Sequence, residues 1–142
     1  RMAILTIGFD LFKESPVIGY GTGDIKDVLI EGYKKENFIK GFDRKYNCHN
    51  QFLQFLLAFG IIGLLVFSVS LIYPMFFAFF KKNYLFVFLI LMLSFNFLFE
   101  SMLETKAGVE FYAFFNALLI GVSSKKRDWL FFIHSNETKS YD

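Results

Sequence analysis

The sequence predicts an all-α integral membrane protein, in which about three transmembrane helices follow a segment of short helices. Hydrophobic residues make up 55% of the 142 residues, and Phe alone occurs 22 times. Residues 51–80 contain no charged side chain. A soluble domain rarely leaves so long a segment uncharged, because its surface helices need a polar face. The net charge of +2 is close to balance and gives no reason to expect nucleic acid as a partner.

The first 50 residues are expected to form short helices separated by turns. Residues 1–14 have apolar positions at helical spacing. Pro16 ends this helix, because the residue before a proline avoids the helical region. Residues 25–35 are expected to form a second helix with Asp24 as its N-cap. Residues 36–47 are polar and are expected to be irregular.

Residues 51–122 are expected to form the membrane domain, with helices at about 51–80, 84–103 and 108–122. About 20 apolar residues span a hydrocarbon core of ~30 Å. The first run exceeds that length, so it is expected to tilt or to project beyond the lipid. The other two runs are short unless their polar flanks extend them. Residues 123–142 are expected to form a polar tail.

The basic residues predict the orientation in the membrane. Lys and Arg follow the first membrane helix and recur in the tail after residue 122. Short segments rich in Lys and Arg are cytoplasmic, so three spans place both clusters, and the tail, in the cytoplasm. Residues 1–50 and the loop 100–108 then share the opposite face of the membrane.

A candidate site lies where the polar segment meets the first membrane helix. His49 can exchange protons near neutral pH, and Asn50 and Gln54 lie one helical turn apart beside it. Glu100, on the same face of the membrane, could orient His49 through its second ring nitrogen. Position alone leaves an interfacial residue or a helix cap as the alternative for His49. Glu104 is expected to end its helix in water.

Two other patterns are interpreted as structural. Gly19-x-Gly21-x-Gly23 lacks the strand–turn–helix context of a phosphate-binding loop, so a turn is expected. Cys48, the single cysteine, adjoins His49, but sequence neighbours seldom point at each other, and no metal-ligand spacing follows. No metal and no cofactor are therefore expected.

The spacing His49-Asn50-x-x-Leu53-x₆-Gly60 resembles the signature of the O-antigen ligase and polymerase family. Residues 1–24 are similar to the segment that precedes this histidine in the family. Residues 100–115 are similar to the closing helices of ligase-like proteins from Bacteroidetes-type bacteria. The resemblance covers roughly residues 1–122.

The resemblance implies a fragment of a GT-C-like, multi-pass glycosyltransferase in the bacterial inner membrane, with residues 1–50 periplasmic. Such enzymes transfer a polysaccharide from undecaprenyl diphosphate to a lipid A-core sugar hydroxyl, among membrane lipids. His49 would act as the general base and Arg1 would hold the donor's diphosphate. The start at Arg1 is interpreted as a cut inside a longer protein, so the fragment alone is expected to be inactive.

Three alternatives stay open: for the reaction, for the role of His49 and for the residues that bind the diphosphate. Family polymerases instead join repeat units linked to undecaprenyl diphosphate, with a glycan as acceptor. A non-catalytic membrane module of a polysaccharide export complex would give His49 no special role. Further basic residues could bind the diphosphate, although a solvated surface charge is the preferred interpretation of each: Lys34, Lys35, Lys40, Arg44 and Lys45.

Overall fold

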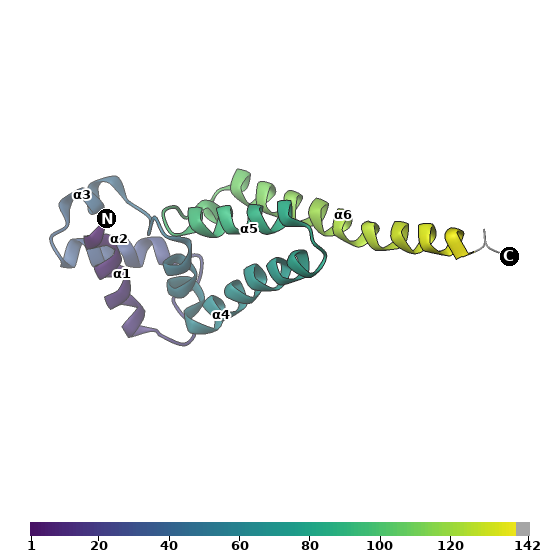
Figure 1. Ribbon diagram of the computed structural model, residues 1–142. Coiled ribbons are helices and arrows are strands. Elements are labelled where there is room, and N and C mark those ends of the chain that lie inside the picture. Colours follow the sequence, from purple (N-terminus) through teal and green to yellow (C-terminus); the bar gives the residue numbers. More distant parts are fainter. Residues whose placement is uncertain (139–142) are drawn as a thin grey trace.

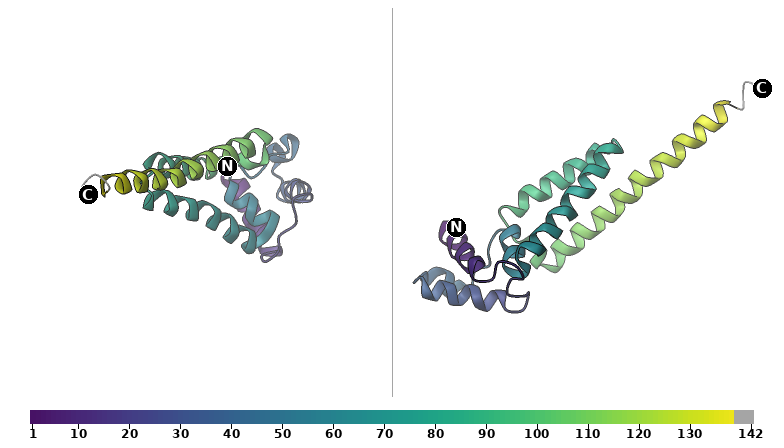
Figure 2. Two further views of the ribbon diagram at one scale, coloured as in Figure 1. Left: turned by 90° about the vertical axis from the view of Figure 1, so that its right-hand side faces the viewer. Right: turned by 90° about the horizontal axis from the view of Figure 1, so that it is seen from below.

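A computed structural model describes the backbone of residues 1–138 and the side chains of residues 1–124. Over these residues the chain is all-helical, as predicted, and contains no strand. The elements are α1 (Met2–Glu14), α2 (Ile25–Lys35), α3 (Ile39–Arg44), α4 (Gln51–Phe80), α5 (Tyr84–Phe97), the 3₁₀ turn η1 (Met102–Glu104) and α6 (Lys106–Thr138). Figures 1 and 2 show α4, α5 and α6 side by side as a shaft, with α1, α2 and α3 gathered as a head at one end.

The head has its own apolar core, to which the first turns of α4 contribute. Leu53 packs against Gly8 of α1, where a Cβ on the glycine would come within 2.7 Å of a Leu53 methyl carbon. The buried side chains of this core come from α1, α2, the loop before α4 and α4 itself: Ile4, Ile7, Ile25, Leu29, Tyr33, Cys48, Leu53, Leu57 and Ala58. The start of α4 is therefore held by the head as well as by the shaft.

Two helices of the shaft are long and apolar enough to cross a membrane. They are Gln51–Phe80 and the Lys106–Ser124 part of α6, and only 33% and 17% of their most apolar windows are buried. The core helix of a soluble protein would be mostly buried, whereas these helices turn their apolar side chains outward. These two helices indicate membrane association. The 14 residues of α5 extend only ~21 Å, less than the hydrocarbon core, so the number of spans stays a prediction.

α4 is broken at Gly60, whose φ of 63° and ψ of −160° lie outside the helical region. The break leaves the carbonyl groups of Leu57 and Ala58 without the partners of a continuous helix. The backbone N–H groups of Tyr20 and Gly21 donate to these two carbonyls, both at 2.8 Å. The N–H of Ile61 donates in turn to the carbonyl of Pro16 at 2.9 Å. The α1–α2 loop therefore replaces the hydrogen bonds that the break removes.

The break divides α4 into an outer part, residues 51–59, and a straight part, residues 61–80. The straight part has a length of ~30 Å, which matches the hydrocarbon core, and Lys81 and Lys82 follow it. The outer part bends away and packs on the head (Figure 1). The excess length of the first apolar run is thus accommodated by a bend, where the sequence indicated only tilting or projection.

Three element bounds differ from those expected from the sequence. Residues 39–44, within the segment expected to be irregular, form α3. α5 ends at Phe97 and not near residue 103, and the carbonyls of Leu98 and Phe99 accept from the side chains of Asn50 and Arg1. α6 continues as backbone helix through Thr138, past the expected end at 122. The basic cluster 125–127 and the rest of the tail lie outside the residues whose side chains are described.

The bend at Gly60 predicts that two glycine substitutions lower the free energy of unfolding by different amounts. Gly21 has a φ of +87° but open space around it, so Gly21→Ala is expected to cost about 1–2 kcal/mol through backbone strain alone. A Cβ on Gly60 would also lie 2.2 Å from the Val17 carbonyl oxygen, so Gly60→Ala is expected to destabilise clearly more. Unfolding of both variants in mild detergent measures the difference, and equal losses would contradict the close approach.

Candidate functional site

His49 lies in a tight turn that the start of α4 requires. The side chain of Asn50 accepts a hydrogen bond from the Leu53 N–H at 2.9 Å and so caps the helix. The chain must turn sharply to enter this cap, and His49 adopts a φ of +45°. Its own N–H donates to the Asn47 side-chain oxygen at 3.1 Å. The sequence Asn47-Cys48-His49-Asn50 therefore presents the imidazole at the very start of α4.

The imidazole of His49 faces the carboxylate of Glu100. Nδ1 lies 3.3 Å from the Glu100 carboxylate oxygens, and the two side chains are 32% and 51% exposed. With its proton on Nδ1, His49 donates to Glu100 and carries its lone pair on Nε2. This is the arrangement in which a carboxylate orients a histidine that accepts a proton at its other nitrogen. The structure thus brings together the two residues predicted as catalytic.

Residues 98–103 are held by three side chains, two at the start of α4 and one just before α1. Asn50 donates from Nδ2 to the Leu98 carbonyl at 3.2 Å. The fully buried Gln51 accepts from the Leu103 N–H at 2.7 Å. Arg1 donates to the Phe99 carbonyl, and its guanidinium lies 5.5 Å from the centre of the Phe99 ring. These contacts fix the backbone on both sides of Glu100.

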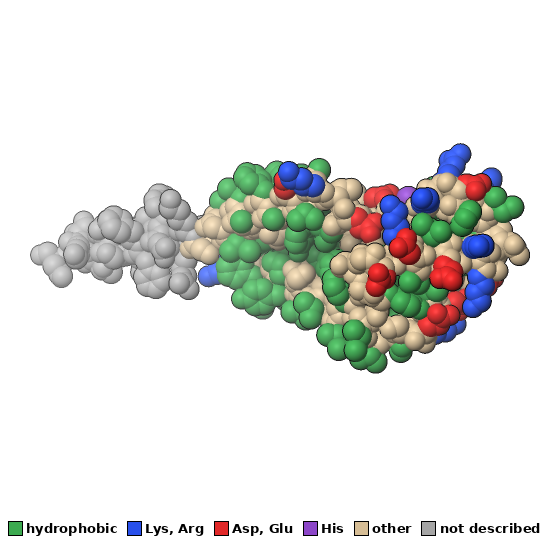
Figure 3. All heavy atoms as spheres, turned by 180° about the vertical axis from the view of Figure 1, so that it is seen from behind, with side chains coloured by type: hydrophobic (Ala, Val, Ile, Leu, Met, Phe, Trp, Pro, Cys, Tyr) green, Lys and Arg blue, Asp and Glu red, His purple; other side chains and the backbone are tan. Residues whose placement is uncertain are grey.

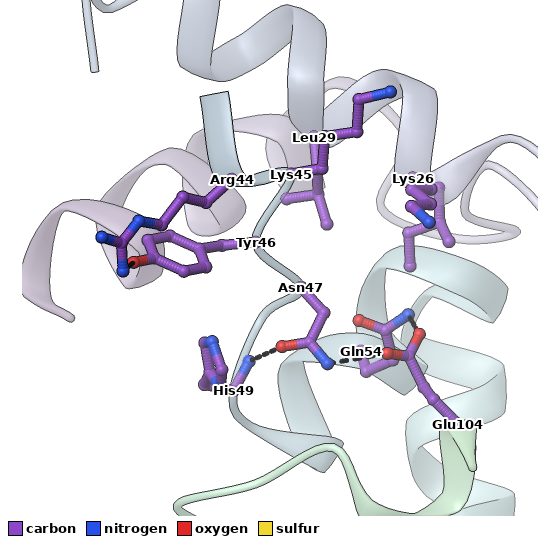
Figure 4. Close-up of a pocket in the computed structure, with 10 residues that line it drawn as sticks. Lys26, Leu29, Arg44, Lys45, Tyr46, Asn47, His49, Gln54 and Glu104 are labelled. Atoms are coloured by element: carbon purple, nitrogen blue, oxygen red, sulfur yellow. Dashed lines mark hydrogen bonds between the residues drawn. The ribbon is translucent and has the colours of Figure 1, made fainter. Parts of the chain in front are cut away.

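Glu104 is the residue that sequence reasoning missed. Its carboxylate accepts from Asn47 Nδ2 at 3.0 Å and from the side-chain amide of Gln54. Asn47 in turn accepts from the His49 N–H, so Glu104 is connected to the His49 turn through one side chain (Figure 4). The sequence placed Glu104 at a helix end in water, because nothing in the sequence links positions 47 and 104.

Two adjoining pockets meet at Gln54 and Glu104. The first has a volume of about 430 Å³, contains His49, and takes three cationic side chains into its wall: Lys26, Arg44 and Lys45. Figure 4 shows Arg44 beside Tyr46 on one side and Glu104 beside Gln54 on the other. The second has a volume of about 410 Å³ and is more apolar, with Phe55, Ala58, Phe59 and Leu103 in its wall. A polar pocket therefore adjoins a more apolar one beside the outer part of α4.

The predicted binding residues occupy different places in this arrangement. Gln54 lines both pockets. Asn50 uses its side chain to cap α4 and to hold the Leu98 carbonyl, and Arg1 holds Phe99; neither lines the two pockets. Their assignment to substrate stays a prediction. Of the basic residues considered further, Arg44 and Lys45 reach the first pocket, and Lys26 joins them.

Cys48 is buried beneath His49, with 1% of its surface exposed. Burial, followed by the nearby charge of Glu104, raises the pKa of the Cys48 thiol to about 12. The thiol is therefore protonated near neutral pH, and a thiol in that state is neither a nucleophile nor a metal ligand. Among the described residues, no group of three or more His, Cys, Asp or Glu side chains is placed to hold a metal ion.

The hydrogen bonds of Glu104 predict that it stabilises this end of the molecule. Glu104→Ala leaves the Gln54 amide, in a side chain only 6% exposed, without its partner, so the expected loss is about 1–3 kcal/mol of unfolding free energy. Glu110→Ala is the matched control, because Glu110 is exposed and contacts only Lys106, at 3.7 Å; its cost should stay within about 0.5 kcal/mol. Thermal unfolding in detergent compares the two, and a neutral Glu104→Ala would contradict the network.

One comparison with known proteins finds a similarity, and it covers somewhat less than half of the chain. Residues 1–68 match the family model described as O-Antigen ligase. No curated protein and no solved structure matches the chain. The matched residues include the head, the His49 turn, the outer part of α4 and the break at Gly60. Over these residues the chain is therefore similar to the O-antigen ligase family.

Proposed function

We propose that this chain forms part of a membrane glycosyltransferase that moves a polysaccharide from undecaprenyl diphosphate to a sugar hydroxyl of lipid A-core at the periplasmic face of the inner membrane. The observation that carries the proposal is the His49–Glu100 pair, whose histidine lines a pocket with cationic side chains. The similarity of residues 1–68 to the O-antigen ligase family supports a lipid-linked glycan as the class of donor.

The proposed step is attack of an acceptor hydroxyl on the anomeric carbon of the donor sugar. His49 Nε2 takes the hydroxyl proton as the new C–O bond forms. The bond between the anomeric carbon and the diphosphate breaks, and undecaprenyl diphosphate leaves with the electron pair. Glu100 holds the imidazole in the correct tautomer and stabilises the imidazolium that results. His49 then returns its proton to the solvent or to the diphosphate.

The two pockets suit the two ends of such a donor. The developing negative charge on the diphosphate needs cations, and Lys26, Arg44 and Lys45 line the polar pocket. Arg44 suits this role because a guanidinium bonds two phosphate oxygens at once. The first isoprene units need an apolar surface close to the lipid, and the second pocket offers one. Gln54, in the wall between the pockets, would contact the sugar that joins the two ends.

The His49–Glu100 pair predicts losses of activity of different size for substitutions at its two positions in the full-length protein. His49→Ala is expected to lower glycan transfer by about 10²–10⁴-fold, because the general base is lost. Glu100→Gln should lose less, because an amide oxygen still accepts from Nδ1 but carries no charge. Transfer is measured in proteoliposomes with a lipid-linked glycan and lipid A-core, as a gel ladder.

Lys34→Ala is the control, because Lys34 is exposed on α2 and lines neither pocket. It should transfer at the unsubstituted rate. A ladder that is unchanged in His49→Ala would reject the catalytic role and favour a non-catalytic module. Glycan that lengthens on undecaprenyl diphosphate and never reaches lipid A-core would identify a polymerase with the same site.

A further inference from the structure

The loop between α1 and α2 ends in an exposed apolar tip. Val17 is 53% exposed and Ile18 is 76% exposed. The tip follows Pro16 and precedes Gly19, which has a φ of +76° and lies so close to α4 that a Cβ on it would be 2.5 Å from the Leu57 carbonyl oxygen. Two large apolar side chains are thus held outward by a backbone that is itself firmly placed.

The backbone of the tip is attached to α4 at the point where the straight part begins. The Pro16 carbonyl accepts from the Ile61 N–H at 2.9 Å, and a Cβ on Gly60 would meet the Val17 carbonyl oxygen at 2.2 Å. Residues 61–80 have the length of the hydrocarbon core, and the lysines at 81 and 82 mark its far side. Val17 and Ile18 therefore lie at the depth of the near hydrocarbon boundary.

The surface on the two sides of this depth differs in chemistry. Figure 3 shows Lys, Arg, Asp and Glu side chains spread over the head and hydrophobic side chains over the shaft. Below the tip, the exposed residues Ile61, Ile62 and Leu65 continue the apolar surface along α4, with 42%, 55% and 59% of their surfaces exposed. The tip is thus the first part of a continuous apolar surface that faces away from the described helices.

We propose that Val17 and Ile18 insert into the acyl chains of the adjacent lipid leaflet and anchor the head to the membrane surface. The partner is lipid, because the tip lies at the hydrocarbon boundary and is continuous with the outward face of a spanning helix. The same loop holds the Leu57 and Ala58 carbonyls, so the anchor sets the depth of the outer part of α4 and of His49 at its start. The proposal goes beyond the transferase function and requires only that α4 spans the membrane.

Fluorescence quenching by brominated lipid tests the anchor in the full-length protein. Native tryptophans, including Trp129, are replaced by Phe, and Ile18→Trp is introduced alone. The protein is reconstituted in vesicles of phosphatidylcholine, with or without bromine on the acyl chains. Trp at position 18 is expected to emit at short wavelength and to lose most of its emission in brominated lipid. Val17→Trp repeats the test if Ile18→Trp does not fold.

Phe42→Trp on α3 is the control, because α3 lies at the end of the head away from the shaft (Figure 1). It should keep its emission in brominated lipid. Unquenched emission at long wavelength from position 18 would place the tip in water and overturn the proposal. Unquenched emission at short wavelength would show that another protein surface covers the tip, and that result would overturn it as well.

Discussion

The break in α4 at Gly60 is the constraint on which the rest of the structure depends. A break in a helix leaves carbonyl and N–H groups that need partners, and within a membrane an unpaired backbone group costs several kcal/mol. The α1–α2 loop supplies those partners through Tyr20, Gly21 and Pro16. Because the loop is thereby fixed to the break, α1 and α2 pack against the outer part of α4 and the head acquires a single position.

The end of α5 also needs hydrogen-bond partners, and the bonds that it forms position the other half of the site. α5 ends at Phe97, and the carbonyls of Leu98 and Phe99 accept from Asn50 and Arg1. These bonds hold the loop that contains Glu100 next to His49. Two helix ends that need hydrogen-bond partners thus bring a histidine and a carboxylate together, although they are 51 positions apart in the chain. We infer that the site's geometry follows from satisfying backbone groups at the membrane surface.

Periodicity and composition predicted α1, α2 and the apolar helices but not α3, and the family signature pointed to His49. The positions of the break and of the α5 end were not predictable in the same way. Both depend on hydrogen bonds between segments far apart in sequence, such as Ile61 with Pro16 and Asn50 with Leu98. Glu104 was missed for this reason. Gly60 permits the bend and the close approach of the Val17 backbone, and neither follows from its place in the family spacing.

Labelling of single cysteines from the two sides of the membrane tests the central claim that His49 and the Glu100 loop share one face. In a Cys48→Ser background, Asn47→Cys reports on the His49 turn, Lys106→Cys on the start of α6 and Lys82→Cys on the loop after α4. A membrane-impermeant maleimide should reach positions 47 and 106 from the same side and position 82 from the other. Labelling of position 106 from the side of position 82 would contradict the account.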